Sequence, residues 1–232
     1  MENVPVFISI VFGLTVLLTM LLFYKATNHS KITLGILLAW IILQSIVGLA
    51  GFYTISNTTP PRFMLLAVPP VLFIAMLFIT PKGRRYIDSL NIKTLTLLHI
   101  VRIPVEIGLF LLFLHKAAPK IITFEGGNID ILSGLTAPFV YYFGFVRNRL
   151  GKNLIIAWNI ICLAFLINVV ARAILSAPFP FQKFAFDQPN IAILHFPFIL
   201  LPGFIVPLVF FSHLVTIRQS IKGSGNKNTA YL

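Results

Sequence analysis

The chain has 232 residues, of which 58% are hydrophobic and only 10% are charged, and its mean hydropathy is +0.94. A soluble domain carries roughly 25% charged residues, so this composition excludes a single water-soluble core and indicates a polytopic membrane protein. The net charge of +12 comes mostly from lysines and arginines in short loops between apolar segments, so nucleic acid is not an expected partner. Cys162 is the only cysteine, which excludes an intrachain disulfide and a cysteine-based metal site.

Seven apolar segments are long enough to cross a bilayer, and they predict an all-α transmembrane bundle of seven helices. In chain order the predicted helices cover residues 4–24, 32–53, 62–80, 94–115, 129–146, 153–175 and 190–216. The bundle is expected to form one domain over residues 1–222, and the polar residues 223–232 are expected to form a disordered cytoplasmic tail. The start of the first segment is acidic and no small-residue cleavage pattern follows it, so this segment is interpreted as a membrane helix rather than a signal peptide.

The charges of the loops predict the orientation of the bundle. With the N-terminus outside, twelve of the eighteen lysines and arginines fall in inside loops and the C-terminal tail, and four fall in outside loops. The remaining two, Arg102 and Arg172, lie within segments. The positive-inside rule therefore predicts a multi-pass protein of the bacterial inner membrane, with the N-terminus outside and the C-terminus in the cytoplasm. The basic stretch over residues 80–93 is interpreted as an interfacial turn at the anionic inner leaflet.

The sequence also suggests an internal repeat. Trp40 in LLAWIIL and Trp158 in IIAWNII lie in similar contexts, and each is followed one loop later by a proline-interrupted segment. Matching Pro69 with Pro202 makes the first three segments correspond to the last three, with the fourth as a linker. This parallel 3+1+3 plan is similar in topology to SWEET-type sugar carriers. Those carriers have their signature prolines in the first two helices of each half, whereas the prolines here lie in the third.

Four short motifs give the chain a resemblance to a known family. They are TPPRF at residues 59–63, TFEGGNIDILSGLTAP at residues 123–138, VARAILSAP at residues 170–178 and FAFDQPN at residues 184–190. On these motifs, and over most of its length, the chain resembles a family of uncharacterised bacterial seven-helix inner-membrane proteins. The resemblance implies a membrane location and supplies no mechanism.

The fourth segment carries polar residues in an apolar run. His99, Arg102 and Glu106 fall within an arc of about 60° on one helix face, and Arg102 and Glu106 are i, i+4 neighbours that can pair. Pro104 removes one backbone hydrogen bond and predicts a kink there. An unpaired arginine at the bilayer centre costs about 2.5–3.5 kcal/mol on insertion scales. We therefore expect a buried Arg102–Glu106 ion pair, with either a structural or a functional role.

Other segments add polar residues that are expected to lie in the outer half of the bundle. The predicted substrate-binding residues are Arg102, Glu106, Asp130, Asn168, Arg172 and His195. Together they predict an outward-facing polar cavity. Two alternative interpretations stay open: Arg172 can extend to the outer interface, and His195 can be an ordinary hydrogen-bonded residue at a helix end.

Two outside loops differ from plain connectors. The first, residues 118–134, contains a Gly-Gly turn, and the second, residues 176–190, interleaves aromatic with polar side chains. Both are candidates for a lid over the cavity, and the aromatic residues of the second can instead anchor it at the membrane interface. The residues assigned to this lid are Glu125, Asn128, Gln182, Asp187 and Gln188.

These features lead to the hypothesis that the protein binds and transports a small polar or anionic solute. Arg102 and Arg172 would contact the solute, and Glu106 would act as a proton-linked switch, because burial and a neighbouring cation act in opposite directions on its protonation.

Two alternatives belong to other classes of protein. One is a membrane enzyme with its site at the outer face, built from Asp130, Ser133 and His195, and the other is a non-catalytic assembly or sensory subunit with unknown protein partners. An enzyme is the less favoured alternative, and no catalytic residue or metal site is assigned, because the sequence has no HExxH, GxSxG or P-loop pattern.

Haem is considered because four of the five histidines lie on predicted helices. His99 and His115 are 16 residues apart and therefore point about 160° away from each other, which is incompatible with a two-haem arrangement on four histidines. One haem held by His99 and His213 is kept as an alternative to the expectation of no cofactor.

Overall fold

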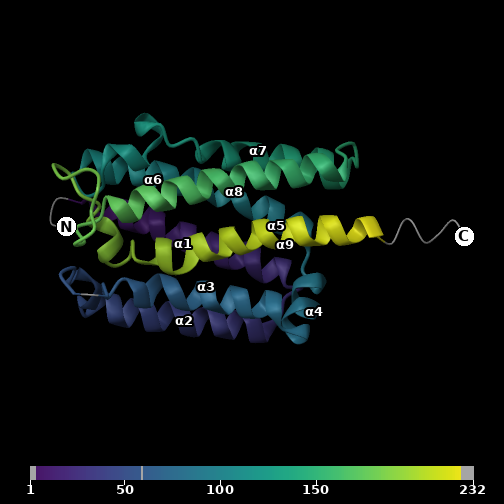
Figure 1. Ribbon diagram of the computed structural model, residues 1–232, viewed down its shortest axis with the longest axis horizontal. Coiled ribbons are helices and arrows are strands. Elements are labelled where there is room, and N and C mark those ends of the chain that lie inside the picture. The colour runs from purple at the N-terminus through teal and green to yellow at the C-terminus, as the bar shows by residue number, and fades with distance from the viewer. Residues whose placement is uncertain (1–3, 59, 226–232) are drawn as a thin grey trace, which may run out of the picture.

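The computed structural model describes residues 4–58 and 60–225, and throughout these residues every regular element is a helix (Figure 1). The α-helices are α1 Val6–Ala26, α2 Lys31–Leu49, α3 Met64–Ile79, α4 Pro81–Ser89, α5 Ile92–Leu98, α6 Arg102–Leu114, α7 Ile131–Tyr141, α8 Lys152–Leu175 and α9 Val206–Gly225. Shorter 3-10 and π segments connect or extend them: η1 Phe52–Thr54, η2 His99–Val101, η3 Lys120–Ile122, η4 Phe124–Gly126, η5 Tyr142–Val146, η6 Ala192–Leu194 and η7 Leu201–Ile205.

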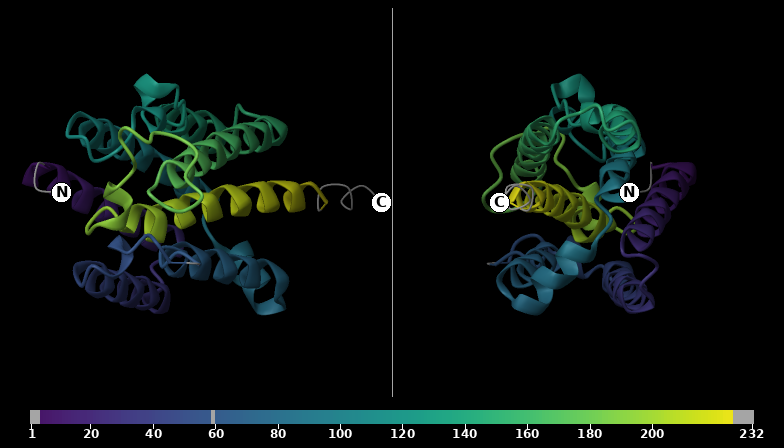
Figure 2. Two further views of the ribbon diagram at one scale, coloured as in Figure 1. Left: turned by 60° about the vertical axis from the view of Figure 1, so that its left-hand side comes forward. Right: turned by 90° about the vertical axis from the view of Figure 1, so that its right-hand side faces the viewer.

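The helices form an elongated bundle. Helices α2 and α3 lie along one edge and α7 and α8 along the opposite edge, with α1, α5 and α9 between them (Figures 1 and 2). Helix α5 packs against α1, α7 and α9, and α8 packs along α9. The short helix α4 lies across one end of the bundle, at an angle of 95° to α3. The centre of the bundle is therefore formed by α1, α5 and α9, with α6 continuing the chain from α5.

Five helical runs are long and apolar enough to cross a membrane: Val6–Ala26, Lys31–Leu49, Ile92–Leu114, Lys152–Leu175 and Leu201–Lys222. The bent pair α3 and α4 makes a sixth if it is counted as one span, and the apolar run Ile131–Val146 is shorter. The structure thus confirms an all-helical protein with several membrane-length apolar helices, and it supplies five or six spans by this criterion rather than seven.

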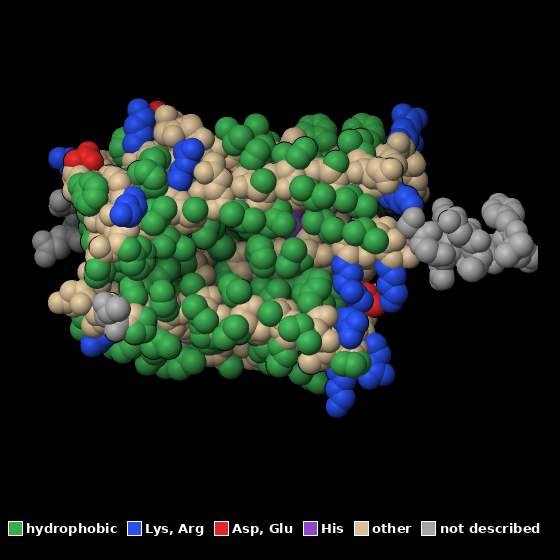
Figure 3. All heavy atoms as spheres, viewed as in Figure 1, with side chains coloured by type: hydrophobic (Ala, Val, Ile, Leu, Met, Phe, Trp, Pro, Cys, Tyr) green, Lys and Arg blue, Asp and Glu red, His purple; other side chains and the backbone are tan. Residues whose placement is uncertain are grey.

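Apolar side chains cover the middle of the surface, while lysines and arginines gather toward the two ends (Figure 3). Helices α1, α2 and α3 expose many of the large apolar residues, among them Ile10, Ile42 and Leu72. Such a continuous apolar belt is unfavourable in water and is compatible with a lipid environment, because each helix satisfies its own backbone hydrogen bonds.

Several predicted boundaries are wrong. The second segment ends at Leu49 rather than at residue 53, because Gly51 adopts a left-handed conformation with φ of 71°. The seventh was expected to begin at residue 190, but the region before Leu201 forms η6 and turns. Helix α9 continues to Gly225, beyond the expected end at residue 216, so residues 223–225 of the expected tail are helical. The rest of the tail lies outside the described residues.

The two tryptophans that suggested the repeat have different partners. The indole Nε1 of Trp40 donates a hydrogen bond to the carbonyl of Gly203 at 2.8 Å. This carbonyl has no donor four residues later in the helix, because Pro207 has no N–H. Trp158 donates instead to the hydroxyl of Thr136 on α7, at 2.9 Å. The proposed repeat matches α2 with α8 and α3 with the α9 region, so equivalent tryptophans would contact equivalent helices. Their contacts differ, and the repeat is not confirmed.

The basic stretch that was expected to form a turn is the helix α4. The Thr80 hydroxyl accepts a hydrogen bond from Gly83 N at 3.1 Å, and Pro81 occupies the first helical position, both typical of a helix start. Asp88 fastens the other end of α4 to α9, because its carboxylate accepts hydrogen bonds from Lys222 Nζ at 2.6 Å and Arg218 Nε at 3.2 Å. The hydrogen bond from Lys222, with that from Arg218 and the charges of both, lowers the pKa of Asp88 below its usual value of 3.8.

Acid should weaken this attachment. A carboxyl whose pKa is lowered by folding contributes stability above its unfolded pKa, and this contribution disappears as the pH falls through the folded pKa. We expect the free energy of unfolding to decrease below about pH 4 in the native protein, and to decrease less in Asp88→Asn, which has no carboxylate to protonate. Thermal unfolding in detergent across this range measures the difference. Equal slopes for the two proteins would contradict the assignment.

Candidate functional site

The fourth predicted helix is broken where its polar residues lie. Pro104 cannot donate a backbone hydrogen bond to Ile100, and the chain forms the 3-10 turn η2 over His99–Val101 between α5 and α6. Arg102 is the first residue of α6. Gly134 of α7 lies directly against this point, since a Cβ atom there would come within 2.9 Å of the Ile103 side chain. The break and the glycine together let α7 approach closely beside Arg102.

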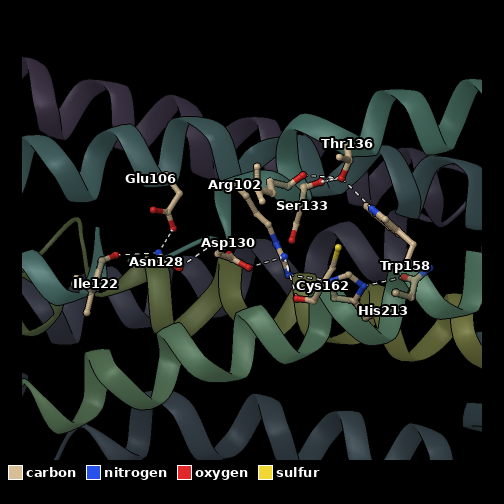
Figure 4. A network of polar contacts seen from close by, with 12 residues as sticks. Arg102, Glu106, Ile122, Asn128, Asp130, Ser133, Thr136, Trp158, Cys162 and His213 are labelled. Atoms are coloured by element: carbon tan, nitrogen blue, oxygen red, sulfur yellow. Dashed lines mark hydrogen bonds and ion pairs between the residues drawn. The ribbon is translucent and has the colours of Figure 1, made fainter. Parts of the chain in front are cut away.

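Arg102 is the centre of a buried polar network (Figure 4). Its Nη1 donates to Asp130 Oδ1 at 2.8 Å and to the carbonyl of Cys162 at 3.3 Å, and its Nη2 lies 2.9 Å from His213 Nε2. The side chains of Arg102 and Asp130 are only 3% and 6% exposed, so this is a buried ion pair. Together these contacts join four parts of the chain: α6, α8, α9 and Asp130, which is the residue before α7. The expected buried pair exists, but its acid is Asp130: among the described residues no ion pair joins Arg102 to Glu106.

Asn128 connects the second acid to this pair. Its amide nitrogen donates to Glu106 Oε1 at 2.6 Å and to the Ile122 carbonyl at 3.0 Å. Its side-chain oxygen accepts from the backbone N–H of Asp130 at 3.1 Å. Asn128 was expected in a lid over the cavity; it is buried, and it contacts the carboxylate of Glu106 and the backbone N–H of Asp130. The loop before α7 is therefore part of the site rather than a cover over it.

His213 extends the network toward the other end of the bundle. Its Nδ1 lies 2.8 Å from Asn159 Oδ1, and the Asn159 amide nitrogen donates to the Ile155 carbonyl, which fixes the orientation of the amide. Because Asn159 Oδ1 accepts and Arg102 donates, His213 is a neutral imidazole with its proton on Nδ1. His99 stacks on His213 with 3.9 Å between ring centroids and an interplanar angle of 18°. Both histidines are fully buried.

This stacking bears on the haem alternative. Two axial ligands approach one iron from opposite faces of the macrocycle, with a nitrogen of each ring directed at the metal. The His99 and His213 rings instead lie face to face, and His213 uses both of its nitrogens in contacts with Arg102 and Asn159. This arrangement does not fit a haem between the two rings.

Three other predicted site residues lie away from the network. Asn168 is exposed on α8. Arg172 extends to the carbonyls of Ile121 and Gly126, at 3.4 and 3.5 Å, in the loop before α7. His195 Nδ1 lies 3.0 Å from the carbonyl oxygen of Ile191, four residues earlier in the chain. Within the part of the chain that the structure describes, no hydrogen bond joins His195 to Asp130 or Ser133. The structure therefore does not bring together the three residues considered for an enzyme site.

The other four residues that were predicted to form a lid lie in the two loops, and the two glutamines among them stabilise the conformation of their loop. Gln188 donates to the carbonyls of Phe113 and Ala118 at 2.8 and 2.7 Å, which fastens the segment over residues 176–190 to the end of α6. Gln182 donates within its own loop, to the carbonyls of Phe184 and Ala185. Glu125 forms an exposed pair with Lys120, and Asp187 is exposed.

A cavity of about 460 Å³ lies beside the network, between α3, α6, α8 and the start of α9. Most of its wall is apolar, formed by residues such as Ala67, Val170 and Ile205. Arg102, Glu106, Asp130 and Asn190 form the polar part of the wall.

Three of these polar residues also carry a buried side-chain atom without a hydrogen-bond partner. Across the described residues, Arg102 Nε, Glu106 Oε2 and Asn190 Oδ1 have no hydrogen-bond partner. Leaving a buried polar atom unpaired costs about 1–3 kcal/mol. Side chains that line a cavity and keep such an unpaired atom are candidates for contact with a bound molecule.

Comparison with known proteins identifies a family but no activity. The model of a domain of unknown function, DUF8737, matches residues 59–220, so the chain belongs to this family. The matched region contains the whole polar network, and α1 and α2 precede it. No curated protein and no solved structure matches the chain.

The buried ion pair gives a test of this geometry. Removing one partner of such a pair leaves an uncompensated buried charge and costs about 3–5 kcal/mol, whereas replacing both partners with apolar residues is often neutral. We expect Arg102→Met to be strongly destabilised and Arg102→Met/Asp130→Leu to recover much of the loss. Unfolding of the purified variants in detergent measures both values.

The exposed pair between Lys120 and Glu125, at 3.7 Å, supplies the control. Lys120→Met should cost only about 0–1 kcal/mol. A double variant as unstable as the sum of its two single variants would show that Arg102 and Asp130 do not act as a pair.

Proposed function

We propose that this protein is a multi-pass membrane protein with seven transmembrane segments that binds and transports a small amphipathic solute. The five membrane-length helices are completed by α3 and by the run Ile131–Val146. That run has 16 residues and extends about 24 Å at 1.5 Å per residue, which nearly crosses a hydrocarbon core of about 30 Å. The excess of basic residues at the end that carries α4 supports a bacterial inner-membrane orientation with the N-terminus outside.

The cavity beside Arg102 is the observation that carries this proposal. Its apolar wall favours a solute with an apolar body, and its few polar lining residues, Arg102, Glu106, Asp130 and Asn190, favour one polar group on that solute. Asp130 already compensates the charge of Arg102 at 2.8 Å. An uncharged or weakly acidic amphipathic molecule therefore suits the site better than the small anion considered from the sequence.

Glu106 is the residue that we assign to coupling. One oxygen of its carboxylate accepts a hydrogen bond from Asn128, and the other has no partner among the described residues and belongs to a side chain that lines the cavity. Protonation of Glu106 would convert a hydrogen-bond acceptor on a cavity-lining side chain into a donor. Uptake of a proton by Glu106 and binding of the solute would then influence each other's free energy, which is the coupling that proton-linked transport needs.

Filling the cavity should prevent solute binding. Ala171 of α8 lines the cavity, and Ala164 lies on the same face of α8 two helical turns away and is not part of its wall. We expect the native protein, purified in its own lipids, to carry an amphipathic compound that Ala171→Phe loses and Ala164→Phe retains. Mass spectrometry of solvent extracts measures the enrichment. If Ala171→Phe carries the same compounds in the same amounts, the cavity is not the binding site.

Glu106→Gln should separate binding from coupling. The carboxamide keeps an oxygen that can accept from Asn128 and removes the titrating proton. With the co-purified compound in reconstituted vesicles, this variant should exchange the compound across the membrane but no longer accumulate it in response to a pH difference. A pH-sensitive dye inside the vesicles reports the accompanying proton movement. Unchanged proton-driven accumulation would remove Glu106 from the mechanism.

A further inference from the structure

A second cavity, of about 590 Å³, lies between α2, α3 and α9. Its long wall is apolar: Ile32, Ile36 and Trp40 contribute from α2, and Pro70, Phe73 and Leu77 contribute from α3. Ile32, Ile36 and Phe73 are also exposed at the surface of the bundle, so the cavity is a groove on the side that would face lipid. Unlike the cavity at Arg102, it has no charged residue in its wall.

The groove is one leaflet deep. Its wall follows α2 from Ser30, just before the helix, to Trp40, ten residues further on. At 1.5 Å per residue this distance is about 15 Å, half of a hydrocarbon core that is about 30 Å thick. Ser30 lies at the end of the bundle where α4 crosses, so the groove runs from that membrane surface to the middle of the bilayer. An acyl chain of one leaflet has the same extent.

Hydroxyl groups line the surface end of the groove, and two exposed lysines lie close to them in the sequence. Tyr86 of α4 and Thr33 of α2 both line it, and their side-chain oxygens are 3.3 Å apart. Lys31 lies two residues before Thr33, and Lys82 lies four residues before Tyr86 on the same face of α4. Both lysines are exposed, and over the described chain neither has an acidic partner. Asp88 of α4 is instead engaged by Arg218 and Lys222 of α9.

We propose that this groove is a binding site for an anionic phospholipid. One acyl chain occupies the groove along α2, and the phosphate lies near Lys31 and Lys82, within reach of the hydroxyl groups of Thr33 and Tyr86. The two lysines at this end of the bundle favour an anionic headgroup, since each lysine near an anionic leaflet contributes about a fivefold gain in binding. The site is separate from the cavity at Arg102 and does not depend on the proposed transport.

Trp40 provides a built-in reporter, because it lines the groove and the chain has only two tryptophans. In a Trp158→Phe background, Trp40 is the single source of tryptophan fluorescence. The protein is reconstituted into bilayers that contain an increasing fraction of phosphatidylglycerol or phosphatidylcholine with a brominated acyl chain. We expect brominated phosphatidylglycerol to quench Trp40 at a lower mole fraction than brominated phosphatidylcholine.

Charge removal at the opening separates a specific site from general lipid contact. Lys31→Gln and Lys82→Gln should each reduce the preference for phosphatidylglycerol about fivefold. The matched control is Lys116→Gln/Lys120→Gln, which removes two lysines at the opposite end of the bundle and should keep the preference. Quenching that is equal for the two lipids, or a preference that survives Lys31→Gln/Lys82→Gln, would overturn the proposal. Both lysines are exposed, and native mass spectrometry of retained lipid checks the result independently of fluorescence.

Discussion

The burial of the Arg102 charge is the constraint on which the rest of the structure depends. A guanidinium group in the middle of an apolar bundle requires a counter-charge and further acceptors nearby. Asp130, the Cys162 carbonyl and His213 supply them from three different parts of the chain. Each contact fixes the position of one element relative to α6. The three contacts of Arg102 therefore set the positions of α8, of α9 and of the loop that precedes α7.

The cavity at Arg102 lies beside this network. Asn128 holds Glu106 and Asp130 together, and these contacts use only part of the hydrogen-bonding capacity of the site. The residues that carry these atoms line a cavity whose other walls are apolar, whereas the groove along α2 has no charged residue in its wall. The two spaces therefore differ in the chemistry of their walls, which is why we propose a solute with one polar group for the first and a lipid for the second.

Much of the candidate site could be predicted from the sequence, but its pairing could not. Arg102, Glu106 and Asp130 stand out because charged residues are rare in apolar segments, and all three line the cavity. Glu106 was chosen as the partner of Arg102 because i, i+4 contacts on one helix are visible in the sequence. The actual partner, Asp130, lies 28 residues away and reaches Arg102 only because α7 packs closely beside α6 at Gly134.

The all-helical fold class and the approximate positions of the helices follow from the order of apolar and basic residues. The reason is that the free energy of moving a residue out of water depends mainly on its type. Local chemistry also accounts for the break near Pro104, since a missing N–H acts within one helical turn. Rotation of each helix about its axis depends on contacts between helices, and for this reason Asn168 is exposed while Asn159, on the same helix, is buried against His213. Only the packed bundle decides which polar groups meet, which stay unpaired, and where the two cavities lie.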